Sequence, residues 1–323
     1  MERGSRLHRF VRAGITGVLL FVLPLAVFPQ SEKKPSPPNT RIVLLGTGTP
    51  SPDPDRSGPA TAIVVNGTPY LVDFGPGVVR RIAAASQKGV TGLTVVNARI
   101  AFLTHLHSDH TAGYADLILT PWSIGRSQPL EVYGPRGLRH MTDHILEAYR
   151  EDIAIRRNDK RMLGVPEQAD GYKVNAHEIA PGTVYKDENV TVKAFLVNHG
   201  DVPQAFGYRI EAPDRTIVIS GDAAPSQSIV DSCNGCDVLI HEAYSMLTYN
   251  AVSPGYQQYR RKHHTSSHEM AEVAKKARPG LLILHHRANP GGVGRPNPEQ
   301  ALLDEVRQLY GGKVVIGHDL DVF

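Results

Sequence analysis

Short apolar runs rich in β-branched residues recur along the chain from residue 41 onward. Runs of this length and composition predict strands. They cover residues 41–45, 61–65, 70–72, 100–104, 192–197, 216–220, 238–241, 281–284 and 313–316. Helical periodicity predicts helices over residues 77–86, 138–150, 267–277 and 298–309. Because strands outnumber helices and the two do not alternate strictly, the pattern predicts sheets packed on one another and covered by helices.

Polar side chains follow several of these apolar runs directly. His105, His199, Asp222, Glu242 and His286 each stand at or just after the end of a predicted strand. A rigid core that presents polar groups from several strand ends pre-organises a binding or catalytic site. The pattern therefore predicts one site built from segments that lie far apart in the sequence.

The N-terminal segment differs from the rest of the chain. Residues 1–12 carry Arg3, Arg6, Arg9 and Arg12 against Glu2, and residues 13–28 are almost entirely apolar. A basic stretch followed by an apolar run is typical of an export signal. We expect a signal peptide or N-terminal anchor at 1–30, a Pro-rich linker at 31–40 and a folded domain at 41–323. The expected location is periplasmic or extracellular, with no membrane domain beyond that anchor.

Composition excludes several other classes of protein. A chain that is 41% hydrophobic and 21% charged is neither disordered nor a multi-span membrane protein. The net charge of +3 comes from the basic N-terminus, because the remaining chain carries as many acidic as basic side chains. The folded part therefore has no overall positive charge that would attract nucleic acid.

Two cysteines, Cys233 and Cys236, stand in the run CNGC. We interpret them first as small residues in a turn, and second as a disulfide, which an oxidising compartment would allow. A structural zinc site is the least favoured interpretation, because it would need further soft ligands and the chain has no other cysteine.

The strongest chemical signal is the run HLHSDH at residues 105–110. His105 and His107 lie two residues apart and can share one direction in an extended segment. Asp109 and His110 follow a turn and can face a second ion. The spacing therefore suggests two metals, and imidazole with carboxylate ligands suits Zn, Mn, Fe or Ni better than Mg or Ca.

This H-x-H-x-D-H pattern resembles the signature of the metallo-β-lactamase superfamily of hydrolases. The resemblance implies an α+β fold, the αββα four-layer sandwich, with a metal site at the strand ends. It implies that His105, His107 and His199 bind one ion, that Asp109, His110 and His286 bind a second, and that Asp222 bridges them. Asp73 is expected behind the ligands. His285 and His286 both follow a strand, and the family pattern favours His286.

Further motifs resemble the ribonuclease Z-like, phosphodiesterase branch of that superfamily. They are LLGTGTP at 44–50, LIHEA at 239–243, HTS at 264–266, GYRI at 207–210 and GHDL at 317–320. Phosphodiester cleavage needs a proton for the leaving oxygen, and a histidine beyond the ligands can supply it. We expect His264 in that role, oriented by Glu242 or His241. The expected catalytic residues are Asp109, His264 and Glu242.

The expected function is hydrolysis of phosphodiester or related anionic ester bonds by attack of a metal-bridging hydroxide. Two divalent ions are expected as cofactors, zinc first, with Mn2+ or Fe2+ as alternatives. A lactonase, with Tyr244 or Tyr208 near the metals, or a β-lactamase is the first alternative. A ribonuclease Z-like RNA 3′-end endonuclease is the second.

The expected partner is a small ester or phosphodiester substrate. Nucleic acid stays open, because Arg156, Arg157, Lys160 and Arg161 form a basic run without a long Gly/Pro-rich arm. The resemblance allows a homodimer, because dimers are common among those relatives, but no interface can be read from the sequence.

Overall fold

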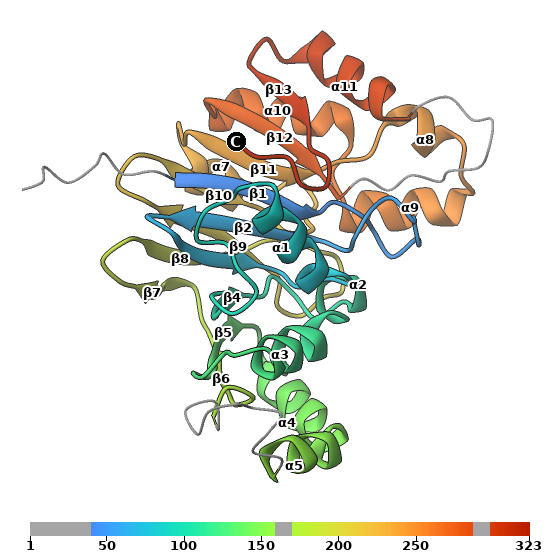
Figure 1. Cartoon of the computed structure of the whole chain (residues 1–323). Coiled ribbons are helices and arrows are strands. Elements are labelled where there is room, and N and C mark those ends of the chain that lie inside the picture. Colours follow the sequence, from blue (N-terminus) through green and yellow to red (C-terminus); the bar gives the residue numbers. More distant parts are fainter. Residues whose placement is uncertain (1–39, 159–169, 287–297) are drawn as a thin grey trace, which may run out of the picture. The chain divides into compact units, whose positions relative to one another are not determined.

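The computed structural model describes residues 40–158, 170–286 and 298–323, and its centre is a pair of mixed β-sheets (Figure 1). The first sheet contains, in spatial order, β1 (Thr40–Gly46), β2 (Ala60–Val65), β3 (Thr68–Val72), β4 (Ile100–Phe102), β5 (Leu130–Gly134) and β6 (Val174–Glu178). The second contains β13 (Val314–Ile316), β12 (Leu281–His285), β11 (Val238–Glu242), β10 (Thr216–Ile219), β9 (Phe206–Glu211), β8 (Thr191–Leu196) and β7 (Gly182–Lys186).

Each sheet has an antiparallel half and a parallel half. Strands β1 to β3 are antiparallel and β3 to β6 are parallel. In the second sheet, β7 to β10 are antiparallel and β10 to β13 are parallel. Since the carboxyl ends of neighbouring parallel strands lie at the same edge of a sheet, each sheet presents one edge where successive strands end together.

Strand side chains alternate between two hydrophobic cores. In β1, Ile42 and Leu44 contribute to the core between the sheets, whereas Val43 and Leu45 face the helices. Helices α1 (Val78–Gln87), α3 (Tyr114–Ser123) and α4 (Leu138–Ala148) contribute to the outer core of the first sheet. Helices α7 (Gln227–Cys233), α10 (Ser267–Ala277) and α11 (Pro298–Leu309) cover the second. The expected αββα sandwich is confirmed, and burial of both strand faces explains the continuous apolar runs.

Some elements differ from those that the sequence pattern predicts. The helix expected over 138–150 ends at Ala148, and α5 (Arg150–Asn158) begins after the break at Tyr149. Strands β5, β6, β7 and β9 were not predicted. Strands β6 and β7 are partly exposed and carry few apolar residues, whereas β5 and β9 interrupt their apolar residues with glycine and charged side chains. The helices α3 and α7, the short helices α2 (Ser108–Thr111) and α8 (Met246–Asn250) and the polar helix α9 (Pro254–His263) were also missed.

Helix α10 spans Ser267–Ala277, the range that the sequence pattern predicts. Ser266 is its N-cap and forms a capping box with Glu269. The Ser266 hydroxyl accepts a hydrogen bond from the Glu269 backbone N–H, and the Glu269 carboxylate accepts one from the Ser266 backbone N–H. These two bonds satisfy backbone groups that a helix start leaves free, and they set where the segment after His264 becomes helical.

The C-terminal tail covers the edge of the first sheet and holds a loop near the strand ends. Phe323 and Ile42 exchange backbone hydrogen bonds of 2.9 and 3.0 Å. The Asp319 carboxylate accepts hydrogen bonds from the Thr47 hydroxyl at 2.8 Å and the Ser57 backbone N–H at 2.8 Å. A side chain at Gly46 would lie 1.9 Å from a backbone oxygen, so this loop requires glycine there. The GHDL and LGTGTP motifs are thus parts of one structural unit.

Cys233 and Cys236 form a disulfide at the end of α7. Both cysteines are buried. The preferred interpretation, two small residues in a turn without a bond between them, was therefore wrong. The second interpretation, a disulfide, is confirmed.

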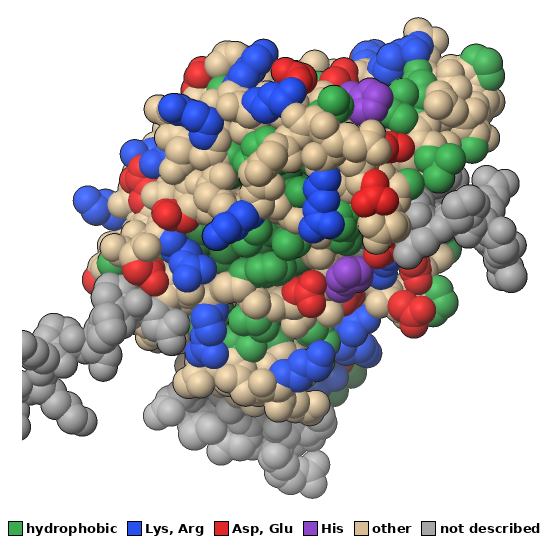
Figure 2. All heavy atoms as spheres, turned by 90° about the horizontal axis from the view of Figure 1, so that it is seen from above, with side chains coloured by type: hydrophobic (Ala, Val, Ile, Leu, Met, Phe, Trp, Pro, Cys, Tyr) green, Lys and Arg blue, Asp and Glu red, His purple; other side chains and the backbone are tan. Residues whose placement is uncertain are grey.

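Several sequence predictions fall outside the described residues. They concern the signal or anchor at 1–30, the linker up to residue 39, and the basic residues Lys160 and Arg161. Arg156 and Arg157 lie in the last turn of α5. Within the described ranges, no helix is long and apolar enough to cross a membrane. Basic and acidic side chains are interspersed over the face shown in Figure 2, as the charge balance of the folded part predicts.

Candidate metal centre

The two sheets bring their strand ends to one site. Asp73 follows β3, His105 follows β4 after two further residues, and Asp222 follows β10. Glu242 ends β11, and His286 follows the last residue of β12. All five side chains are buried, so polar groups from five strand ends share an interior space.

The first group of potential ligands contains His105, His107 and His199. One ring nitrogen of each lies within 4.8 Å of those of the other two. The ring centroids of His105 and His107 are 4.6 Å apart, and those of His105 and His199 are 4.8 Å apart. His105 and His199 are buried, whereas His107 is half-buried, so the group opens toward solvent on the His107 side.

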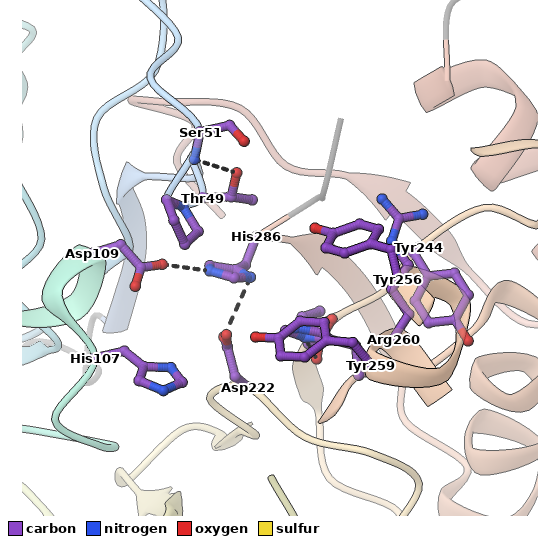
Figure 3. A pocket seen from close by; sticks show the side chains of 13 residues that line it. Thr49, Ser51, His107, Asp109, Asp222, Tyr244, Tyr256, Tyr259, Arg260 and His286 are labelled. Atoms are coloured by element: carbon purple, nitrogen blue, oxygen red, sulfur yellow. Dashed lines mark hydrogen bonds and ion pairs between the residues drawn. The ribbon is translucent and has the colours of Figure 1, made fainter. Parts of the chain in front are cut away.

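The second group contains Asp109, His110 and His286. Asp109 Oδ2 lies 3.1 Å from His286 Nε2, as Figure 3 shows. Asp222 lies beside the second group: its Oδ1 is 3.3 Å from His110 Nε2 and 3.3 Å from His286 Nδ1. A third set, His105, His110 and Asp222, has ligand atoms within 4.8 Å of one another and joins the two groups.

Three of the histidines have a hydrogen-bond partner at the ring nitrogen that faces away from the site. His105 Nδ1 contacts the Thr104 hydroxyl at 3.0 Å, and His110 Nδ1 contacts Asp73 Oδ2 at 2.8 Å. His199 Nδ1 donates to the His263 backbone carbonyl at 2.8 Å. Partners of this kind fix the tautomer and turn the opposite nitrogen toward a metal. Asp73 therefore supports a ligand rather than joining either group.

The electrostatic environment favours a bound cation. Burial lowers the pKa of His105 well below its ordinary value and that of His199 to about 4. Burial would raise the pKa of Asp222, but His286 and His110 hold it well below the ordinary value. Burial opposes protonation of His110, yet Asp222 and Asp73 raise its pKa well above the ordinary value. Neutral imidazoles and an ionised carboxylate are the forms that bind metal, so His105, His199 and Asp222 are in the binding form, whereas His110 would release its proton when a cation binds.

Unsatisfied atoms identify the binding space. His105 Nε2, His110 Nε2, Asp222 Oδ1 and His286 Nδ1 are buried and form no hydrogen bond of good geometry with any described residue. A buried polar atom without a partner costs about 1–3 kcal/mol, so native proteins rarely leave several together. Imidazole and carboxylate atoms converging in this way fit divalent cations such as zinc.

A further histidine stands beside the ligand groups. His264 Nδ1 lies 2.8 Å from Glu242 Oε1, and this oxygen also accepts a hydrogen bond from the Ala223 backbone N–H at 3.1 Å. Burial would lower the pKa of His264, but the Glu242 carboxylate raises it to about 9. His241 bonds to the Glu242 backbone carbonyl instead. Glu242 therefore orients His264, and the alternative partner, His241, does not.

Members of both ligand groups, together with Glu242 and His264, line a pocket of about 300 Å³ (Figure 3). It is lined by Thr49, Pro50, Ser51, His107, Asp109, Asp222, Glu242, Tyr244, Tyr256, Tyr259, Arg260, His264 and His286. His285 is absent from this lining. It is buried with both ring nitrogens unpartnered, and burial lowers its pKa to about 3.

A known protein family matches the part of the chain that contains this site. The family described as Beta-lactamase superfamily domain matches residues 68–287, which include every residue of both ligand groups. The chain belongs to this superfamily. Its expected fold and ancestry are thereby confirmed.

The superfamily relatives point to one branch. Ribonuclease Z of Mycobacterium marinum is 33% identical over 286 residues, which cover 86% of this chain and 96% of that protein. The chain is therefore ribonuclease Z-like. The short form of human tRNase Z has the same fold, with a TM-score of 0.60, 24% identity, and coverage of 88% of this chain and 98% of that one. The metallo-β-lactamase fold protein YhfI of Bacillus subtilis has a TM-score of 0.63 at 20% identity, with coverage of 88% and 98%.

Superfamily membership makes the chain a metal-dependent hydrolase, and the ligand groups fit the divalent metal that this fold implies. The sequence did not single out the pocket residues Ser51, Tyr256, Tyr259 and Arg260, and it placed Thr49 and Pro50 only in the LLGTGTP motif. The spacing of Tyr256, Tyr259, Arg260 and His263 at i, i+3, i+4 and i+7 was a signal for one helix face. Its polar composition concealed the helix.

The two tyrosines considered for a lactonase site, Tyr208 and Tyr244, lie in different surroundings. Tyr208 is fully buried and donates to the Leu103 backbone carbonyl at 2.7 Å, outside the pocket. Tyr244 lines the pocket but is only 2% exposed. Tyr208 was therefore a wrong candidate for the lactonase tyrosine.

Proposed function

We propose that this hydrolase is a dinuclear zinc phosphodiesterase. The observation that carries the proposal is the His264–Glu242 pair placed beside two ligand groups that share Asp222. His105, His107 and His199 would hold one ion, Asp109, His110 and His286 the second, and Asp222 both. Two metals with an adjacent acid suit cleavage of a charged ester whose leaving oxygen needs a proton.

The bound ions would supply Lewis acidity, which lowers the pKa of water and neutralises charge on the phosphate. Asp109, at the pocket wall, accepts hydrogen bonds and orients the attacking water. As the phosphorus–oxygen bond breaks, His264 donates its proton from Nε2 to the leaving oxygen. Glu242 holds the opposite nitrogen and stabilises the protonated ring. The buried position of Glu242 keeps this contact away from competing water.

RNA cleavage is a second candidate function. It is favoured by the 33% identity to a protein named Ribonuclease Z, over 96% of that protein's length. Between β5 and β6, the described residues contribute α4 and α5, whose last turn carries Arg156 and Arg157. An RNA substrate would present the same phosphodiester to the same metal centre, so both candidates share one mechanism.

The direct test of the proposed function is hydrolysis of bis(p-nitrophenyl) phosphate by the metal-loaded protein. We expect turnover that a chelator abolishes and that added zinc restores. The chelator would remove the metal ions from the ligand groups, and added zinc would bind there again. A lactone and a β-lactam serve as comparison substrates at equal concentration. Turnover of the lactone or β-lactam with none of the phosphodiester, by protein shown to hold two metals, would refute the proposal.

We also propose that the protein is exported. The basic and apolar N-terminal segments support this, as does the Cys233–Cys236 disulfide, since such bonds persist in oxidising compartments. N-terminal mass spectrometry of the protein from fractionated cells of its source is the measurement. Export predicts recovery outside the cytoplasm. Recovery only from the cytoplasm, with Cys233 and Cys236 as free thiols, would contradict it.

A further inference from the structure

Two exposed tyrosines form part of the pocket wall. Tyr256 is 45% exposed and Tyr259 is 40% exposed, and both line the pocket that contains the ligand groups. Their rings are stacked, with centroids 5.7 Å apart and planes at 14°. In Figure 3 the loop residues Thr49 and Ser51 lie on one side of His286 and the tyrosines on the other. Large aromatic side chains left exposed beside a metal site need an explanation other than core packing.

The two rings project from one helix face. Tyr256 and Tyr259 are three residues apart on α9, and Arg260 and His263 follow each of them by four. Residues at these spacings lie side by side on a helix surface. The same face therefore carries two exposed rings and, one turn further along, two buried side chains.

The buried side chains of Arg260 and His263 pack against the exposed rings of Tyr256 and Tyr259. The guanidinium carbon of Arg260 lies 5.1 Å from the Tyr256 ring centroid and 5.4 Å from that of Tyr244. The His263 ring stacks on Tyr259 with centroids 4.3 Å apart, and its Nδ1 donates to the Tyr259 backbone carbonyl at 2.9 Å. Rings held in this way lose little freedom when a ligand binds, which favours affinity.

Charge at the wall suits an anionic ligand. Arg260 is 1% exposed, donates to the Thr248 hydroxyl at 3.0 Å, and forms no ion pair with a carboxylate of the described residues. Its positive charge is therefore balanced by aromatic faces, not by an anion of the protein. The pocket thus combines a metal centre for a phosphate, a nearby cation and a flat aromatic surface.

We propose that Tyr256 and Tyr259 form a stacking platform for the nucleobase next to the scissile phosphodiester. This inference rests on the proposed phosphodiesterase function and narrows its substrate to nucleotide phosphodiesters. A pocket of about 300 Å³ is at the small end of ligand sites, so it suits one unpaired nucleotide better than a duplex. Unstacked bases bind aromatic side chains without strong sequence preference.

The test compares two ligands that differ only by the base. Binding of adenosine 5′-monophosphate and of ribose 5-phosphate to the metal-loaded protein is measured by calorimetry. We expect the nucleotide to bind at least about tenfold more tightly, within the range measured for one base stacked on an aromatic side chain. In the Tyr256→Leu/Tyr259→Leu variant this ratio should fall to about one, because the sugar phosphate contacts remain and the stacking surface is gone.

Two further variants separate stacking from other effects. Tyr256→Phe/Tyr259→Phe keeps the rings and should keep the ratio; its loss there would overturn the stacking role. Tyr149→Leu removes a tyrosine that is 43% exposed but lies outside the pocket, and it should leave the ratio unchanged. An unchanged ratio in the double leucine variant, or a wild-type ratio near one, would overturn the proposal.

The result is distinguishable from failure of the proposed function. Chelator-sensitive hydrolysis of bis(p-nitrophenyl) phosphate together with equal binding of the two ligands would overturn the platform alone. A tenfold preference for the nucleotide that depends on Tyr256 and Tyr259, in a protein without phosphodiester turnover, would support the platform as a nucleotide site and overturn the proposed reaction.

Discussion

Asp222→Ala is expected to abolish metal binding and phosphodiester hydrolysis together. Asp222 is 3% exposed, and its Oδ1 lies 3.3 Å from a ring nitrogen of both His110 and His286. Its ligand atom also lies within 4.8 Å of a ring nitrogen of His105 in the first group, so its loss weakens both sites. Loss of a residue that merely supports a ligand costs about 10–100-fold in metal affinity or activity, and loss of a shared ligand should exceed that range.

Metal content after dialysis and kcat on bis(p-nitrophenyl) phosphate are the two measurements for this variant. Asp231→Ala is the matched control, because Asp231 is an exposed carboxylate on α7 that contacts Gln227. It should retain metal and rate. Asp222→Ala protein that still held two metals per chain, or that turned over at the wild-type rate, would contradict the shared-ligand assignment.

His264→Ala is expected to retain both metals but lose most of the rate. Its ring contacts Glu242 at 2.8 Å, and the hydrogen bonds that orient the proposed ligands come from other residues. A positioned general acid contributes about 10²–10⁴-fold, and we expect kcat to fall within that range. The matched control is His268→Ala, an exposed histidine at the start of α10. Equal kcat in His264→Ala and wild type would remove His264 from the mechanism.

The dependence of kcat on pH distinguishes a proton-donating role of His264 from a purely structural one. Glu242 raises the pKa of His264 to about 9, so the proton-donating form is present below that pH and kcat should fall above it. In Glu242→Gln the raising charge is gone while burial still lowers the pKa. The alkaline limb should therefore move down by about two pH units, toward the ordinary histidine value near 6.5. Bound cations act on both proteins alike, so the difference between the two profiles is the readout.

A fall in kcat for Glu242→Gln without any movement of the alkaline limb would contradict this assignment. It would mean that Glu242 supports the loop through its hydrogen bond from Ala223 and does not set the protonation of His264. Glutamine keeps an oxygen for that bond, so the variant isolates the effect of charge from the effect of shape.

Much of the fold could be predicted from local patterns, because each β-strand of the central core is buried on both faces. The runs 41–45 and 238–241 lie within β1 and β11 for that reason. Strands β6 and β7 were missed because partial exposure lets them carry polar residues, and β5 and β9 because glycine and charged residues interrupt their apolar runs. The boundary between α4 and α5 depends on how the chain turns at Tyr149. The spacing of apolar residues along the sequence gives no sign of this turn.

The sequence by itself determined the metal-binding chemistry of this protein. Four potential ligands within residues 105–110, placed directly after a buried strand, are local in the chain and need no knowledge of distant contacts. The resemblance of the remaining motifs then placed Asp73, His199 and Asp222 in order along the chain. The structure brings these residues together, and the carboxyl ends of adjacent parallel strands lie at one edge of a sheet.

Only the tertiary structure decided which side chains meet. The distance of 3.1 Å between Asp109 and His286, 177 positions apart, depends on how the two sheets stack. His286 lies in the ligand group and His285 does not, because the chain leaves β12 after His285 and His286 takes a left-handed backbone conformation with φ of 45°. The pairing of Glu242 with His264 and the tyrosine face of α9 likewise arise from packing between distant segments, which local spacing does not encode.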